Sequence, residues 1–159
     1  MTETGTGDLK GKKILIIEDD PLLHNLLADK MKQLRDKGVE VFPTMSAEEG
    51  LKQAQSSKPD LIMLDLVLPT MNGFEFLEGL RKEPGLEKTP VVVLSNLSDD
   101  SDKERAKALG VVAYLVKADF SLSEISGAIE EILQGRKMPE HDSSAPTIKS
   151  TPSGNMIFL

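Results

Sequence analysis

The chain has 159 residues, 39% of them apolar and 28% charged, a composition typical of one folded domain and not of a disordered chain. Its formal net charge of −7 argues against direct binding to nucleic acid or to an anionic membrane surface, because both require basic surface. Cysteine is absent, which excludes disulfides and thiolate sites, and no secretory signal or membrane-spanning run is present, so we expect a cytoplasmic protein.

Short apolar runs alternate with longer segments of helical period, and this alternation is typical of a parallel sheet covered by helices. The first run, residues 12–18, predicts a strand. A helix should then begin at Pro21 and end at Gly38, because proline favours the first helical position and glycine the left-handed end. Residues 39–42 predict a second, short strand.

The middle of the chain contains the most continuous apolar run. Ser46 and Glu49 form the pattern of a capping box at the start of a second helix. Residues 60–65 predict the third strand, and because nearly all are apolar we expect it at the centre of the sheet, covered on both faces. Asn72 is placed to cap the helix that follows.

Two more strand and helix pairs complete the pattern. Residues 89–95 predict the fourth strand, followed by a short polar helix capped by Ser98 or Asp99. Residues 111–116 predict the fifth strand, and Ser121 begins the last helix. The chain is therefore predicted to contain five consecutive pairs of this kind.

The two ends of the chain lack this pattern. From residue 136 the composition changes to Pro, Ser, Thr, Lys and Asp without periodicity, which predicts a disordered tail. We therefore divide the chain into a flexible segment, 1–11, a domain, 12–135, and a tail, 136–159. The apolar residues 156–159 at the end of the tail either dock into a partner or have no function.

Polar residues stand at the ends of the predicted strands. Glu18 and Asp19 follow the first strand, Asp65 ends the third, Ser95 ends the fourth and Lys117 follows the fifth. In an open doubly wound sheet these ends meet at one edge, where ligands bind. Three carboxylates that repel one another need a cation such as Mg²⁺. An acid cluster with a hydroxyl and an ammonium suits phosphoryl transfer to a carboxylate.

Four dispersed motifs carry a family resemblance. They are Ile-Ile-Glu18-Asp19-Asp20-Pro21, Leu-Asp65-Leu-Val-Leu-Pro69 with Asn72-Gly73, Leu-Ser95-Asn96 and Tyr114-Leu-Val-Lys117. Over about residues 12–134 the chain resembles the receiver domain of response regulators in two-component signalling. Ser95 and Lys117 follow Asp65 by 30 and 52 residues, spacings similar to those of the family. The resemblance implies an α/β fold: a doubly wound, five-stranded parallel sheet, flavodoxin-like (βα)5, with strand order 2-1-3-4-5.

The resemblance also implies roles for the acids. Asp65 would accept a phosphoryl group from the phosphohistidine of a sensor histidine kinase, from a phosphotransfer protein or from a small phosphodonor. Asp19 would bind Mg²⁺ directly, together with Asp65, Glu18 and the backbone carbonyl of Val67. The product would be an aspartyl phosphate.

Three further residues would respond to that phosphate. Lys117 and Ser95 would contact phosphoryl oxygens, and Tyr114 would rotate inward as Ser95 moves. The chain has Ala118 where many family members have a proline in a cis bond. A cis bond before alanine costs about 3 kcal/mol or more, so either this loop is trans or the fold enforces the strain.

A receiver of this kind signals through other proteins. About 24 residues follow residue 135, too few for an output domain, so the resemblance implies a stand-alone response regulator. Its output would be a changed contact with a downstream protein target, made by the face around the fourth helix, fifth strand and fifth helix or by the tail. Phosphorylation-dependent dimerisation is a further possibility. The chain would catalyse only its own phosphorylation and dephosphorylation.

Three other functions are weighed against this one. An aspartyl-phosphate phosphatase would need a second Asp two residues after Asp65, where Val67 cannot transfer a proton. A P-loop nucleotide switch would need glycine at Thr6 and a hydroxyl at Lys13. A receiver-like module that binds partners without being phosphorylated is the third, and the complete set of acids, hydroxyl and lysine argues against it.

Overall fold

The computed structural model describes all residues except 1–8, 69, 98, 135–146, 151–154 and 159. The elements in chain order are β1 Lys13–Ile17, α1 Pro21–Lys30, α2 Lys32–Asp36, β2 Glu40–Thr44, α3 Ala47–Ser57, β3 Leu61–Leu64, α4 Gly73–Arg81, β4 Val91–Ser95, α5 Asp100–Ala108, β5 Val111–Val116, the 3₁₀ turn η1 Lys117–Asp119, α6 Leu122–Leu133, β6 Thr147–Ser150 and β7 Asn155–Phe158. Within the described residues, no helix has both the length and the apolar character needed to cross a membrane.

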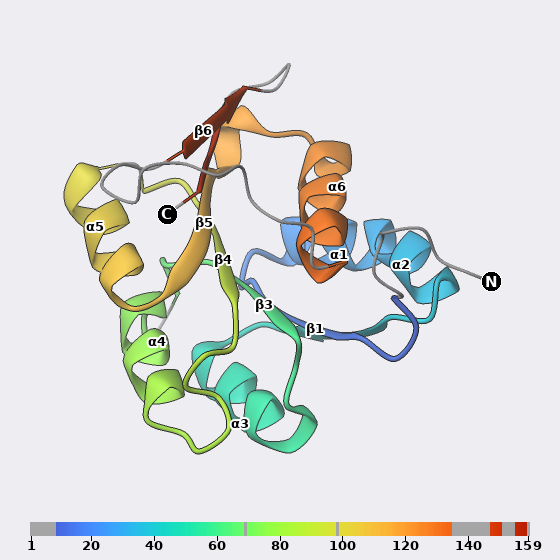
Figure 1. The fold of residues 1–159 in the computed structure, drawn as a ribbon, viewed down its shortest axis with the longest axis horizontal. Coiled ribbons are helices and arrows are strands. Elements are labelled where there is room, and N and C mark those ends of the chain that lie inside the picture. Colours follow the sequence, from blue (N-terminus) through green and yellow to red (C-terminus); the bar gives the residue numbers. More distant parts are fainter. Residues whose placement is uncertain (1–8, 69, 98, 135–146, 151–154, 159) are drawn as a thin grey trace.

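One sheet forms the middle of the molecule, with strand order β2-β1-β3-β4-β5-β7-β6. The first five strands pair in parallel, which confirms the predicted order 2-1-3-4-5. All residues of β3 are buried, as expected for the central strand. Strands β6 and β7 extend the sheet antiparallel beyond β5 (Figure 1). The sequence analysis predicted no strand there and expected residues 136–159 to form a disordered tail. Of that range only residues 147–150 and 155–158 are described, and for these the prediction is wrong because they form strands.

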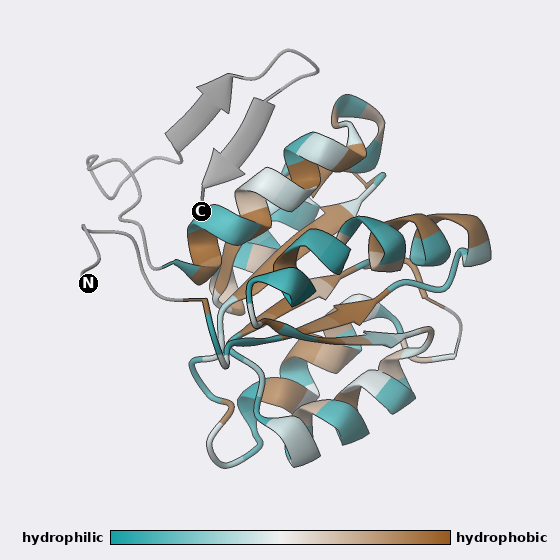
Figure 2. Cartoon of the chain, turned by 90° about the vertical axis from the view of Figure 1, so that its right-hand side faces the viewer, coloured by the Kyte–Doolittle hydropathy of each residue, from teal (hydrophilic) through white to brown (hydrophobic). Residues whose placement is uncertain are grey.

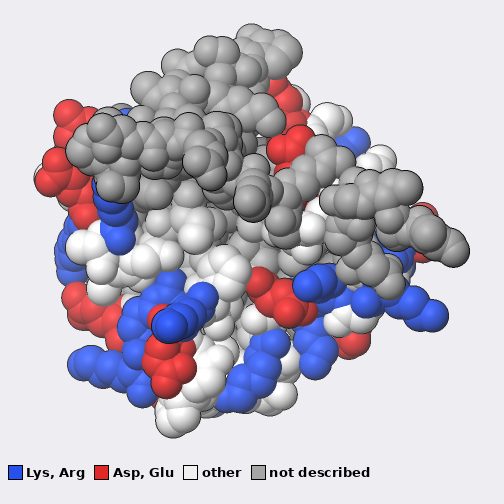
Figure 3. Space-filling model, viewed as in Figure 1, with Lys and Arg blue, Asp and Glu red and all other residues white. Residues whose placement is uncertain are grey.

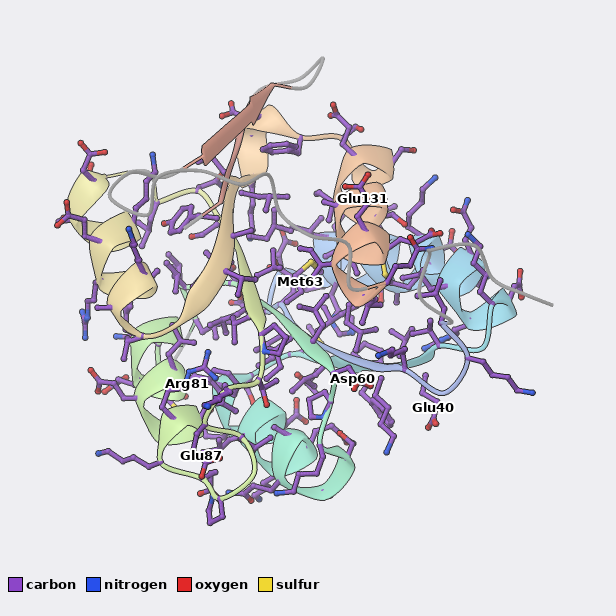
Figure 4. All side chains as sticks on the ribbon, viewed as in Figure 1. Glu40, Asp60, Met63, Arg81, Glu87 and Glu131 are labelled. Atoms are coloured by element: carbon purple, nitrogen blue, oxygen red, sulfur yellow. The ribbon has the colours of Figure 1, made fainter. Side chains whose placement is uncertain are left out.

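Helices cover both faces of the parallel strands. Ile14 and Ile16 of β1 point into one core with α1, α2 and α6, whereas Leu15 and Ile17 point into a second core with α3, α4 and α5. We call these the α1/α6 core and the α4/α5 core. Met63 of β3 points into the α1/α6 core (Figure 4). Figure 2 shows the hydrophobic strands between two helix layers whose outer faces are largely hydrophilic.

The helix starts follow the predicted capping residues. Ser46, Asn72 and Ser121 each accept, through the side chain, a hydrogen bond from the backbone N–H three residues later. Pro21 occupies the first turn of α1, and the side chain of Asp20 caps it through the N–H of Leu22. These local signals set where the chain leaves each strand, and so where the strand ends lie.

Two boundaries differ from the sequence prediction. The helix expected from Pro21 to Gly38 is interrupted at Met31, where the Leu34 N–H bonds to the Met31 carbonyl in a tighter turn, and both side chains are fully buried. At the amino end, Leu9 is buried in the α1/α6 core. Leu9, which the sequence analysis assigned to a flexible segment, therefore packs on the domain, and the N–H of Gly11 donates to the carbonyl of Gly38.

Arg81 at the end of α4 ties together three parts of the backbone (Figure 4). Its guanidinium donates to the carbonyls of Leu109 at 2.9 Å and Gly110 at 3.2 Å, in the turn before β5. It also donates to those of Leu86 at 3.1 Å and Thr89 at 2.8 Å, before β4. One side chain thus fixes α4 against two turns.

Replacing Arg81 with Ala should lower the free energy of unfolding by about 2–4 kcal/mol, because it removes the guanidinium that donates to four carbonyls, of which that of Leu86 keeps the N–H of Thr89. Urea unfolding at constant pH measures this change. Lys82→Ala is the matched control, since Lys82 is exposed, and it should change the free energy by less than about 0.5 kcal/mol. Equal losses in both variants would contradict the role given to Arg81.

Candidate functional site

Three carboxylates meet at the carboxyl ends of β1 and β3. Glu18 and Asp19 follow β1, and Asp65 follows β3, which pairs with β1 in parallel. One carboxylate oxygen from each of the three lies within 4.8 Å of the others. Glu18 and Asp65 are only 2% and 4% exposed, whereas Asp19 is half-buried. The structure therefore brings together the acids that the strand order predicted to meet.

Lys117 bridges two of these acids from the end of β5. Its Nζ lies 2.9 Å from Asp65 Oδ2 and 3.0 Å from Glu18 Oε1. The side chain is 17% exposed, so the ion pairs are largely shielded from water. The bond between Lys117 and Ala118 is trans, in keeping with the absence of cis bonds among the residues described. The ammonium thus reaches the acids without the cis bond that many family members have.

The charges of the cluster do not balance. Burial raises the pKa of Glu18, the hydrogen bond from Lys117 lowers it, and the nearby charge of Asp65 raises it, with a net increase. Burial would lower the pKa of Lys117, but its hydrogen bonds to Asp65 and Glu18 outweigh burial and raise it. Lys117 therefore stays charged, and one ammonium faces three acids. Oxygen donors with excess negative charge fit a hard divalent cation such as Mg²⁺.

Both oxygens of Asp65 have protein partners that fix the carboxylate. Oδ2 contacts Lys117, and Oδ1 accepts a hydrogen bond from the N–H of Val67 at 3.0 Å. Val67 itself is 55% exposed. A carboxylate has about four lone-pair sites, so each oxygen keeps one free for another ligand. The part of the Val67 carbonyl in metal binding stays a prediction.

Ser95 and Tyr114 are connected through the backbone of Leu97. Ser95 ends β4, is fully buried, and accepts a hydrogen bond from the N–H of Leu97 at 3.3 Å. Tyr114 on β5 is also fully buried, and its hydroxyl donates to the carbonyl of Leu97 at 2.7 Å. Burial raises the pKa of Tyr114 to about 12, so this hydroxyl remains a donor. Tyr114 thus lies inside the domain, and its rotation as Ser95 moves stays a prediction.

The loop after Asp65 has a support that the sequence did not reveal. Thr70 adopts φ of 58°, a left-handed conformation that is strained for a β-branched residue. Its hydroxyl donates to Glu48 Oε2 on α3 at 2.6 Å, and this bond lowers the pKa of Glu48. The two residues are 22 positions apart, and neither belongs to a motif. They link α3 to the loop that contains Val67.

Comparison with known proteins agrees with this geometry. A family model described as the response regulator receiver domain matches residues 14–130. The transcriptional regulatory protein CiaR of Streptococcus pneumoniae (strain ATCC BAA-255 / R6) is 39% identical over 122 residues, which are 77% of this chain and 51% of that protein. The KDP operon transcriptional regulatory protein KdpE of Escherichia coli (strain K12) is 36% identical over 121 residues, 76% of this chain and 51% of KdpE.

A solved structure gives the same result for the fold. The chemotaxis response regulator CheY4 of Vibrio cholerae superimposes with a TM-score of 0.67 at 27% sequence identity, covering 76% of this chain and 98% of CheY4. The chain spans about half the length of CiaR and of KdpE, and 15% of the gliding motility regulatory protein of Myxococcus xanthus, which is 29% identical over 123 residues.

Proposed function

The chain belongs to the response regulator receiver domain family, and on that premise we propose that Asp65 is its phosphoacceptor, with Mg²⁺ held by Glu18, Asp19 and Asp65. We take residues 12–135 as the receiver. The observation that carries the proposal is the cluster of three carboxylates within 4.8 Å, bridged by the ammonium of Lys117. Bound Mg²⁺ would offset the negative charge of an incoming phosphoryl group.

In the proposed reaction, an oxygen of Asp65 attacks the phosphorus of a phosphohistidine or a small phosphodonor. The new bond joins this oxygen to phosphorus, and the bond from phosphorus to the donor breaks, with its electron pair leaving on the donor. The hydrogen bond from Val67 and the contact with Lys117 hold the carboxylate in one orientation, which lowers the entropic cost of reaching in-line geometry.

Lys117 and Ser95 are proposed to act on the phosphorylated product. The ammonium already contacts Asp65, so it can pair with a phosphoryl oxygen attached there. The Ser95 hydroxyl lies at the end of β4, beside the strand that leads to Asp65. If it turns to donate to another phosphoryl oxygen, its bond with Leu97 changes, and Leu97 is the acceptor of Tyr114.

The proposed output is a protein contact. A histidine kinase or phosphotransfer protein would supply the phosphoryl group, and a downstream protein, or a second copy, would bind the face formed by α5, β5 and α6. In the part of the surface that the described residues form in Figure 3, basic and acidic side chains are interspersed. CiaR and KdpE are named as transcriptional regulators, and this chain matches about half of each. A mixed surface favours protein partners over nucleic acid.

Incubation with acetyl phosphate and Mg²⁺, followed by intact mass spectrometry, tests the function. We expect a mass gain of one phosphoryl group, and removal of Mg²⁺ with EDTA should abolish the gain because the acid cluster then repels the donor. Addition of excess Mg²⁺ after EDTA should restore it. A chain that gains no mass with Mg²⁺ present, or gains it equally in EDTA, would contradict the proposal.

Lys117 and Mg²⁺ should compete for the same acids. Lys117→Met removes the cation that balances Glu18 and Asp65, so the site becomes more negative and should bind Mg²⁺ on the order of tenfold more tightly, measured by calorimetry. In the absence of metal the variant should be less stable by about 3 kcal/mol, since it leaves buried acids unpaired. The exposed Lys107→Met is the control and should change neither quantity. Weaker Mg²⁺ binding to Lys117→Met would show that the acids are not the metal site.

A further inference from the structure

The edge of the parallel sheet at β5 is covered by residues from the same chain. Without them, β5 would end the sheet and leave a row of backbone N–H and C=O groups unpaired. Strand β7 pairs with β5 in the register Ala113↔Phe158 and Tyr114↔Ile157. Strand β6 pairs with β7 along its whole length. We call β6 and β7 the C-terminal hairpin, and it occupies the free edge of β5 (Figure 1).

The composition of this hairpin suits strand addition. Residues 147–158 include one lysine and no acid in a chain of net charge −7, and the β7 residues 155–158 include no charged residue. Natural edge strands that stay unpaired usually carry charges that prevent pairing. Pro152 and Gly154, residue types favoured in turns, stand between the two strands in the sequence. The segment therefore has the features of a peptide that binds a sheet edge through its backbone.

The edge that it covers is connected to the candidate site. Tyr114 pairs with Ile157 through the backbone, and its hydroxyl donates to the carbonyl of Leu97. The N–H of Leu97 in turn donates to Ser95, at the end of β4. A change at Ser95 therefore reaches the β5 residue that pairs with the C-terminal hairpin through two hydrogen bonds and one side chain.

We propose that the C-terminal hairpin is a tethered ligand of the β5 edge, which it closes to partner strands, and that phosphorylation of Asp65 releases it. The release rests on the proposed function. A phosphoryl group adds about two negative charges and three acceptor oxygens at the edge where Ser95 lies, which favours a new Ser95 hydrogen bond. We assign the pairing of β7 with β5 to the unphosphorylated chain, because a new Ser95 bond would disturb Leu97, whose carbonyl accepts from Tyr114. Because such coupling is reciprocal, loss of the hairpin should favour phosphorylation.

Amide hydrogen exchange on the full chain, without phosphodonor, tests whether the hairpin occupies the edge. Ile157→Pro removes one backbone N–H donor from β7. Because β7 lies between β5 and β6, the substitution breaks a backbone hydrogen bond to one of these two strands. Amides of β5 should then exchange at least about tenfold faster, while those of β1 and β3 keep their protection. Glu140→Pro, outside both strands, is the matched control and should exchange as wild type.

Unchanged exchange in β5 of Ile157→Pro would overturn the proposal. If β1 and β3 also lose protection, Ile157→Pro has destabilised the whole domain, and the same exchange is then measured on Ile148→Pro. Ile148 lies in β6, which pairs only with β7 among the described strands. There a selective rise in β5 exchange supports the proposal, and no rise overturns it. Protection of β5 that increases with protein concentration, together with a dimeric mass by light scattering, would assign the occupant to a second copy and also overturn it.

The same measurement with acetyl phosphate and Mg²⁺ tests the release. We expect β5 exchange in the wild type to approach that of Ile157→Pro once intact mass shows phosphorylation, and Ile157→Pro to reach a several-fold higher phosphorylated fraction. Absence of any mass gain would contradict the proposed function, but it would not affect the conclusion, drawn from exchange without phosphodonor, that the C-terminal hairpin covers β5. A full mass gain with unchanged β5 exchange would overturn the coupling alone.

Discussion

Asp65→Asn should abolish the mass gain with acetyl phosphate and Mg²⁺, slowing labelling at least about a thousandfold, because a neutral amide is a poor nucleophile towards phosphorus. The substitution preserves shape, and its oxygen can still accept from Lys117 or Val67. It also removes one of three acids that repel one another, so the melting temperature without metal should not fall. A loss of labelling in this variant therefore reports on chemistry and not on unfolding.

The same strand provides the control. Asp60 precedes β3 at its opposite end and accepts a hydrogen bond from the N–H of Lys13 at 2.8 Å, which an asparagine oxygen can also accept (Figure 4). Asp60→Asn should label at the wild-type rate. Labelling of Asp65→Asn as fast as wild type would show that another residue is the acceptor, and peptide mapping of the modified chain would identify it.

The convergence of the acids could be predicted because it depends on strand order alone. Asp65 ends a strand that is apolar throughout, and such a strand must be central in a sheet covered on both faces. Glu18 ends the first apolar run, and parallel pairing of neighbouring strands puts both carboxyl ends at one edge. Neither inference depends on the conformation of a loop, so the pattern of apolar residues in the sequence was sufficient to predict this part of the site.

Contacts that depend on loop paths could not be predicted in the same way. The bond between Thr70 and Glu48 joins a strained loop residue to a helix that precedes it by 22 residues. Leu97 connects Ser95 with Tyr114 through backbone atoms, which every residue has, so no residue type marks this role. The interruption at Met31 likewise has no glycine or proline beside it to mark it in the sequence.

Strands β6 and β7 escaped prediction for a different reason. Each has four residues, too few for an alternating pattern to stand out from the polar composition around it. An isolated two-stranded hairpin is marginal in water, so pairing depends on an edge supplied elsewhere in the chain. That edge is β5, and its availability follows from the order 2-1-3-4-5 and not from the local sequence of residues 147–158.

The residues around Asp65 also determine how long a phosphoryl group should persist. Hydrolysis needs a water molecule aligned behind phosphorus, and a side chain that hydrogen-bonds this water accelerates the reaction. Val67 lies two residues after Asp65 and is 55% exposed, and Leu97 lies two residues after Ser95, half-buried against the α4/α5 core. Both are apolar, so neither can orient the water, and we expect a long-lived aspartyl phosphate.

Replacing Val67 with Asn and Leu97 with Glu should therefore speed the loss of phosphate by about tenfold or more, since the pair can then orient and activate the water. The decay is followed by intact mass after the phosphodonor is removed.

Val67→Ala with Leu97→Met is the apolar control, and its phosphate should decay at the wild-type rate. Because Leu97 packs against the α4/α5 core, urea unfolding must show that the double variant with Leu97→Glu remains folded. Val67→Asn alone changes only the exposed position and leaves the packing of Leu97 intact. A wild-type phosphate that decays as fast as that of the double variant would mean that the water is aligned by other groups, and that the two apolar side chains do not set the lifetime.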